Sequence, residues 1–298
     1  MSDIQVTFRG VRGSHAMPGE STIRYGGNTT CLEVRAGGKL LVIDAGTGII
    51  SLGKELIKEH FASQKPMEVV LLLTHMHHDH NEGLPFFQPM YIASSRIYMF
   101  GPDPLEENIS TVLFHSPYFP VELEELPSLK FLHSLMLSDM LYFENNEPRL
   151  IHSIHSPHPS TDDEVIVRIH RGKAHPKEGV FMYRVEYKGK SVAFCTDTEG
   201  YVGGDTGLIR FVDGVDLLIH DAQYSTDNYI NDPVPKQGFG HSTPQMAMEV
   251  ARRAGVGRLI LTHHDPDASD DVLDSVETEV AVEYPGCQLA REGMQIHL

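Results

Sequence analysis

The sequence predicts a mixed α/β fold, and three observations carry this prediction. Short apolar runs at Cys31 to Val34 and Lys39 to Ile43 flank Gly37-Gly38, as in a β-hairpin with a glycine turn. A helical pattern from Ile49 to Phe61 follows the hairpin. The continuous apolar run Val69 to Leu73 is typical of a strand that is buried on both faces.

Strands and helices continue to alternate through the rest of the chain. The pattern predicts further strands at 97–100, 182–187, 191–195, 216–219 and 258–261, and helices at 244–253 and 271–282. No internal repeat or linker divides the sequence, so we expect one domain over residues 1–298. The least regular stretch, 91–161, is broken up by prolines. It is either a substrate-facing insertion or ordinary surface packing.

The composition favours a globular enzyme. Hydrophobic residues make up 41% of the 298 positions, which is enough for a substantial core. No apolar stretch approaches the ~18 residues that a membrane span needs, and the first residues lack a signal-peptide pattern. We therefore expect a cytoplasmic protein with no membrane partner. The three cysteines, Cys31, Cys195 and Cys287, have no CxxC spacing and are predicted to be buried, small apolar residues.

Net charge and histidine content both bear on the partners. The formal net charge is −17, whereas nucleic acids are bound by Lys and Arg side chains that neutralise phosphates. We therefore expect no extended nucleic acid among the partners. Histidine occurs 18 times, and it is the commonest metal ligand in proteins. The composition thus favours a metalloprotein.

A histidine-rich motif follows the predicted buried strand. In the segment 75–80, with the sequence HMHHDH, His75 and His77 alternate on an extended chain and so point to one side. Asp79 and His80 follow in the turn. Imidazole nitrogens together with a carboxylate oxygen suit zinc, and also manganese or iron. A histidine-rich surface loop is the alternative, but the HxHxDH spacing after a buried strand favours a metal site.

Further motifs follow this segment or precede it. Asp44 ends the second hairpin strand, Asp197 lies in FCTDT, His263 lies in LTH, and YGGNTT occupies 25–30. Together with HMHHDH they resemble the metallo-β-lactamase fold superfamily, and within it the phosphodiesterase and tRNase Z branch. The resemblance covers most of the chain. It implies a four-layer αβ/βα sandwich that binds two divalent metal ions, zinc before manganese or iron.

The resemblance also implies which residues bind the ions. One ion would be held by His75, His77 and a third histidine, the other by Asp79, His80 and His263, and Asp197 would bridge the two. For the third histidine we prefer His175, because HPKEG at 175–179 resembles the family's His-Pro-x-x-Gly run, and His158 in PHP is its rival. Asp44 would orient a ligand by hydrogen bonding rather than bind an ion. We expect no ligand role for His78 or His15, and we assign none to His264.

Two later segments resemble the paired loops of tRNase Z enzymes and related phosphodiesterases. They are HDAQY at 220–224 and GHST at 240–243. The resemblance implies that Asp221 orients His241, which would donate a proton to the departing alkoxide. The tRNase has Glu where this chain has Asp221, so the reach is one methylene shorter. The segment also reads as a helix start capped by Ser242 or Thr243, with Pro244 in the first turn, and both interpretations can hold.

These features predict a dinuclear phosphodiesterase. Two ions would lower the pKa of a shared water toward ~7, and the resulting hydroxide would attack a small phosphodiester such as a cyclic nucleotide. Asp79 and Asp221 are counted as catalytic together with His241. A tRNA 3′-processing or other RNA nuclease is the alternative. We place it second because the family's nuclease carries a tRNA-binding arm between the third histidine and the bridging aspartate. Here Asp197 follows His175 by 22 positions, which leaves no room for such an arm.

Other functions fit the residues less well. Hydrolysis of a lactone, thioester or β-lactam would leave the pair Asp221 and His241 without a purpose. A non-enzymatic binding module would not need every expected ligand position to be filled. Because members of the family often dimerise, a homodimer is compatible with the resemblance, although no residue identifies an interface.

Overall fold

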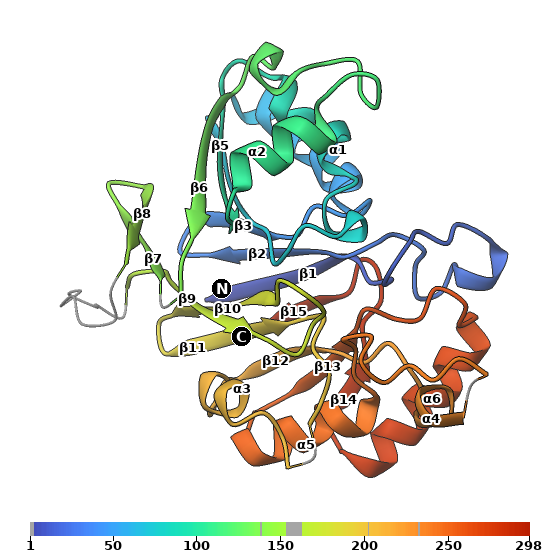
Figure 1. The fold of residues 1–298 in the computed structure, drawn as a ribbon. Helices are drawn as coiled ribbons and strands as arrows, with labels where there is room; N and C mark the ends of the chain where they lie inside the picture. The colour runs from blue at the N-terminus through green and yellow to red at the C-terminus, as the bar shows by residue number, and fades with distance from the viewer. Residues whose placement is uncertain (1–2, 138, 153–162, 202, 232) are drawn as a thin grey trace.

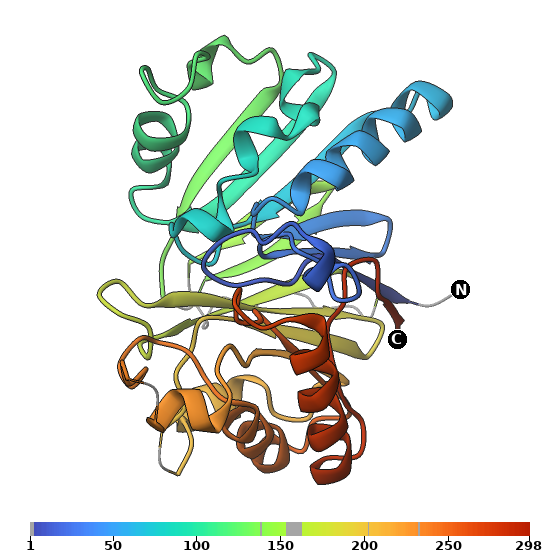
Figure 2. The same ribbon diagram turned by 90° about the vertical axis from the view of Figure 1, so that its right-hand side faces the viewer.

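The architecture is a sandwich of two β-sheets with helices on both outer faces. The structure is a computed structural model, and it describes residues 3–137, 139–152, 163–201, 203–231 and 233–298. The two sheets pack face to face in the middle of the molecule, and helices cover them above and below (Figures 1 and 2). This arrangement confirms the predicted four-layer αβ/βα sandwich.

The first sheet has seven strands in the order β15-β1-β2-β3-β4-β5-β6. Strands β1 to β3 and β15 pair antiparallel, whereas β3 to β6 are parallel. In the pairing of the first and last strands, Gln5 lies opposite His297. The strands are β1 (Ile4–Gly10), β2 (Cys31–Ala36), β3 (Lys39–Ile43), β4 (Met67–Leu72), β5 (Ser95–Pro102), β6 (Leu129–Leu135) and β15 (Gln295–His297).

The second sheet has eight strands in the order β14-β13-β12-β11-β10-β9-β7-β8. Strands β11 to β14 are parallel, and the remaining pairs are antiparallel. The strands are β7 (Met140–Glu144), β8 (Glu147–Ile151), β9 (Ile166–Gly172), β10 (Val180–Tyr187), β11 (Lys190–Cys195), β12 (Leu217–Asp221), β13 (Leu259–Thr262) and β14 (Cys287–Leu289).

Helices cover the outer face of each sheet. The first sheet carries α1 (Ile49–Ser63) and α2 (Leu105–Asn108), with short turns at 78–80, 84–86, 88–91, 109–113 and 123–125. The second sheet carries α3 (Thr206–Phe211), α5 (Pro244–Ala254) and α6 (Asp270–Glu283). The short helix α4 (Thr226–Asn231) follows β12, and a further turn spans 20–22. No helix in the described ranges has both the length and the apolar character of a membrane span.

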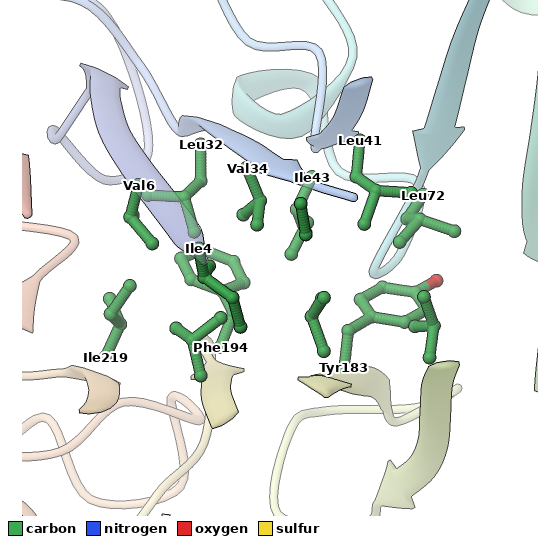
Figure 3. Close-up of a cluster of buried hydrophobic side chains, with 14 of the residues drawn as sticks. Ile4, Val6, Leu32, Val34, Leu41, Ile43, Leu72, Tyr183, Phe194 and Ile219 are labelled. Atoms are coloured by element: carbon green, nitrogen blue, oxygen red, sulfur yellow. The ribbon is translucent and has the colours of Figure 1, made fainter. Parts of the chain in front are cut away.

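Apolar side chains from both sheets meet between them. Figure 3 shows Ile4, Val6 and Leu32 of the first sheet facing Phe194 and Ile219 of the second. On β4, alternate residues join this central core and the outer core beneath α1, because the strand is covered on both faces. This double coverage explains why every residue of β4 except Glu68 is apolar.

The predicted strands and helices are present, and the structure contains several others that the sequence pattern did not predict. The stretch 91–161 contains β5 to β8 in its described part, so it supplies strands to both sheets. Strand β6 was not predicted. It lies at a sheet edge, and most of its residues are exposed or only partly buried, so its sequence lacks a clear alternation of apolar and polar residues. The rival third histidine, His158, lies outside the described residues.

Candidate active site

The candidate site lies at the carboxyl ends of parallel strands. The HMHHDH segment follows β4, Asp197 follows β11, Asp221 ends β12 and His263 follows β13. Parallel strands place their carboxyl ends at the same sheet edge, and the facing of the two sheets brings both edges together. Residues from widely separated parts of the sequence therefore converge on one place.

The first group of potential ligands contains three histidines and one carboxylate. His75, His77, His175 and Asp197 each offer a ligand atom within 4.8 Å of the others. His175 Nε2 lies 3.1 Å from His77 Nδ1, and His75 Nε2 lies 3.5 Å from Asp197 Oδ2. The structure thus places His175 where the third histidine was expected. Two other histidines of that window lie elsewhere, since His152 contacts Asp139 and His170 stacks on Phe211.

The second group contains Asp79, His80 and His263, again within 4.8 Å of one another. His80 Nε2 lies 3.1 Å from Asp79 Oδ2, and His263 Nε2 lies 3.7 Å from the same oxygen. Asp197 also reaches this group, because its Oδ1 lies 3.3 Å from His80 Nε2. Asp197 therefore lies between the two groups.

Three histidines are oriented by neighbours on one ring nitrogen and leave the other free. In each of them Nδ1 hydrogen-bonds a buried side chain, while the buried Nε2 has no hydrogen-bond partner among the described residues. A buried nitrogen without a partner is costly unless something binds it, and an imidazole fixed through its other nitrogen is the usual arrangement of a metal ligand. The site therefore fits metal ions. The partners are Thr74 for His75, Asp44 for His80 and Thr30 for His263.

The loop after β1 contacts the second group. The backbone N–H of Ser14 donates to Asp79 Oδ2 at 2.9 Å. Gly13 leaves space for the His263 ring, because a Cβ atom at Gly13 would lie 2.6 Å from His263 Cδ2. The buried Arg12 anchors this loop by donating to the backbone carbonyls of residues 26, 265 and 268. No local pattern could have revealed contacts between residues so far apart in sequence.

The backbone at the site adopts conformations that most residues avoid. Asp44, Asp197 and His263 have φ angles of 62°, 51° and 61°, in the left-handed region. For a residue other than glycine, such a conformation costs about 1 kcal/mol or more, and it persists only where surrounding contacts enforce it. The charged form of the Asp197 side chain is also stabilised by its neighbours. Burial would raise the pKa of this carboxyl, but His263, His80 and His75 hold the pKa well below its usual range.

The expected pair of Asp221 and His241 is formed. His241 Nδ1 lies 2.9 Å from Asp221 Oδ2, so the shorter aspartate side chain reaches the imidazole. Asp221 also accepts hydrogen bonds from the backbone N–H groups of residues 198 and 223. Burial would lower the pKa of His241, but Asp221, with Asp197 and Asp79, raises it to about 9. Thr243 caps α5, and the His241 ring stacks on His263 with centroids 5.0 Å apart.

The remaining histidines near the motifs lie outside the two groups. His78 and His15 are exposed. His264 is buried, and its Nε2 hydrogen-bonds the backbone carbonyl of Ala290 at 2.9 Å, so it has a structural role.

Comparison with known proteins identifies the family. The model of the beta-lactamase superfamily domain matches residues 40–264, which include both donor groups. This chain is a member of that superfamily. Ribonuclease Z of Thermoplasma acidophilum is 28% identical, with 95% of this chain and 96% of that protein covered, and Ribonuclease Z of Prochlorococcus marinus strain NATL1A is 27% identical, with 99% of each covered.

Two solved structures share the fold of this chain. The short form of human tRNase Z superposes with a TM-score of 0.64 at 22% identity, over 98% of each chain. A diphosphatase of the PhnP family superposes with a TM-score of 0.62 at 17% identity, over 99% of this chain and 98% of that one. The superfamily match and the curated relatives confirm the predicted branch and the predicted enzyme class, a metal-dependent hydrolase of phosphoric diesters.

Two sequence-based predictions are wrong. Full-length relatives from several organisms are named Ribonuclease Z, which contradicts the prediction of a small cyclic-nucleotide substrate. The same names contradict the prediction that no extended nucleic acid is involved. The error lay in using the net charge of −17, which sums over the whole surface, as a measure of the charge near the site. Likewise, the short interval between His175 and Asp197 did not exclude resemblance to these nucleases.

Proposed function

We propose that this chain is a two-metal ribonuclease that cleaves a phosphodiester bond of RNA, with the 3′ end of precursor tRNA as its candidate substrate. The observation that carries the proposal is the contact between the pair Asp221 and His241 and the metal-ligand cluster. Full-length similarity to proteins named Ribonuclease Z supports RNA as the substrate. We take residues 1–298 to act as one domain.

In this proposal the two donor groups hold one divalent ion each. His75, His77 and His175 would bind the first, and Asp79, His80 and His263 the second, with Asp197 shared. Nitrogen and carboxylate donors favour zinc. When bound, such ions activate water and stabilise negative charge on the phosphoryl oxygens.

The proposed role of His241 follows from its hydrogen bond. Asp221 accepts from Nδ1–H and thereby leaves Nε2 as the nitrogen that can exchange a proton with substrate. In hydrolysis the oxygen of water becomes bonded to phosphorus while the bond to the leaving oxygen breaks. That oxygen departs as an alkoxide unless it receives a proton, and protonated His241 can supply one. Asp221 keeps the ring in position during this transfer.

The test compares leaving groups in the metal-loaded protein. The wild-type protein is expected to cleave precursor tRNA and bis(p-nitrophenyl) phosphate, and to leave a lactone intact. His241→Ala should lower kcat on RNA about 100-fold or more, because an alkoxide needs the proton, but should affect the nitrophenolate ester much less. Equal losses on both substrates would overturn the general-acid role. Cleavage of the ester or lactone without cleavage of any RNA would overturn the proposed function.

A further inference from the structure

A lysine and two aromatic rings lie together beside His241. Lys236 Nζ lies 5.9 Å from the ring centroid of Tyr224 and 5.7 Å from that of Phe239. The Tyr224 ring in turn lies 5.9 Å from the His241 ring and nearly perpendicular to it. Tyr224 is buried, whereas the Phe239 side chain is 47% exposed. A positive charge and an accessible aromatic face therefore border the proposed leaving-group side of the site.

The loop that carries Lys236 and Phe239 is held in place by Glu199. The carboxylate of Glu199 accepts hydrogen bonds from the backbone N–H of Gly238 at 2.8 Å and from that of Gly240 at 3.0 Å. It also accepts one from the Tyr229 hydroxyl. Three donors thus engage the carboxylate of this loop anchor and reduce its repulsion of an approaching phosphate. The loop is a formed surface next to the site.

A second loop adds positive charge on the same side. Gly240 packs against the segment after β9, because a Cβ atom at Gly240 would lie 2.4 Å from both His175 Nδ1 and Pro176 Cδ. In that segment Lys173 and Lys177 flank His175 and are exposed. Neither forms an ion pair with a residue in the described part of the chain. Two touching loops therefore carry three lysines, Lys173, Lys177 and Lys236, in a chain whose net charge is −17.

We propose that these two loops bind the RNA strand on the leaving-oxygen side of the cleaved bond. Lys236 would contact a backbone phosphate, and the exposed face of Phe239 would stack on a base. Lys173 and Lys177 would continue the contact along the backbone. Single-stranded nucleic acids are generally held by this combination of cations for phosphates and aromatic rings for bases. We assign these loops to the leaving-oxygen side because Lys236 lies over the ring of Tyr224, and that ring contacts His241, the proposed proton donor to the leaving oxygen. The inference rests on the proposed function.

Binding of an oligonucleotide tests this surface without requiring cleavage. The probe is a fluorescein-labelled, single-stranded 2′-O-methyl phosphorothioate oligonucleotide of about 12 nucleotides, which nucleases cut poorly. Its dissociation constant for the full-length, metal-loaded protein is measured by anisotropy over a series of salt concentrations. Lys236→Ala should weaken binding about fivefold and lower the slope of log Kd against log salt by about 0.7, as for one lost phosphate contact.

Matched variants separate the two kinds of contact. Phe239→Ala should weaken binding about fivefold and leave the salt slope unchanged, because stacking releases no counterions. Lys58→Ala removes an exposed lysine of α1 and should bind as the wild-type protein does. Circular dichroism of each variant checks that it is folded.

The outcomes distinguish this inference from the proposed function. Weaker binding by Lys236→Ala and Phe239→Ala, but not by Lys58→Ala, supports the RNA-binding surface even if the wild-type protein cleaves no RNA. If the wild-type protein and the three variants bind the oligonucleotide with equal affinity, or if none of them binds it, the proposed RNA-binding surface is wrong. This holds even if precursor tRNA is cleaved.

Discussion

The two donor groups that meet at Asp197 differ in how firmly they are held. In the first group His77 is exposed, and among the described residues His175 Nδ1 has a backbone carbonyl as its hydrogen-bond partner, that of Gly240 at 3.3 Å. In the second group all three residues are buried, and each has a hydrogen-bond partner that orients it. The second group also contains a carboxylate of its own, Asp79. A rigid, more negative set of donors binds a divalent ion more tightly, so we expect the two ions to differ in affinity.

Removing the residue shared by both groups should have the largest effect. Asp197→Ala is expected to lower kcat/KM on bis(p-nitrophenyl) phosphate about 1,000-fold or more, because both ions lose a negatively charged donor. Metal content measured by mass spectrometry should fall as well. Asp213→Ala, which removes an exposed aspartate elsewhere, is the control and should match the wild-type protein. A variant that keeps both ions and full activity would show that Asp197 does not connect the groups.

Loosening only the second group should have a smaller and selective effect. Thr30→Val removes the partner of His263 Nδ1 and leaves Thr74, the partner of His75 in the first group, in place. It is expected to lower the affinity of the more tightly bound ion 10- to 100-fold, as measured by competition with a chromophoric chelator. The affinity of the weaker ion should change little. If the weaker ion were the one affected, the assignment of tight and weak groups would be reversed.

Stepwise removal of metal should have the smallest effect, seen in thermal stability. An ion that binds only the folded protein stabilises it, by ~2.7 kcal/mol at a concentration 100 times its Kd. A chelator titration should therefore lower Tm in two steps, a few degrees for the ion near His77 and about 5 °C or more for the other. His77→Ala should show only the second step. A single step in the wild-type protein would indicate two ions of equal affinity.

The residues of the candidate site that could be predicted are those that lie in short, contiguous sequence motifs. The HMHHDH segment follows a strand whose apolar run reflects burial on both faces, so its position at a strand end was evident. His175, Asp197 and His263 were found because short motifs around them resemble the superfamily. Residues that act only through tertiary contact had no such signal: the partner of Asp79 lies 65 positions away at Ser14, and that of His263 lies 233 positions away at Thr30.

The errors have a physical origin as well. Weakly amphipathic strands such as β6 owe their place to pairing with β5 rather than to their own pattern. The substrate was misjudged because net charge carries no information on where charges lie. Lys236 is distant in sequence from Lys173 and Lys177, and only the contact of Gly240 with His175 and Pro176 shows that their loops meet.

The pairing of β1 with β15 has a consequence for synthesis of the chain. Strand β1 is made first, but its partner at residues 295–297 emerges almost 300 residues later. Until then one edge of β1 has unpaired backbone N–H and C=O groups, which other strands can join. A growing chain released early, or one lacking these residues, should therefore associate through this edge and depend on chaperones more than the finished protein does.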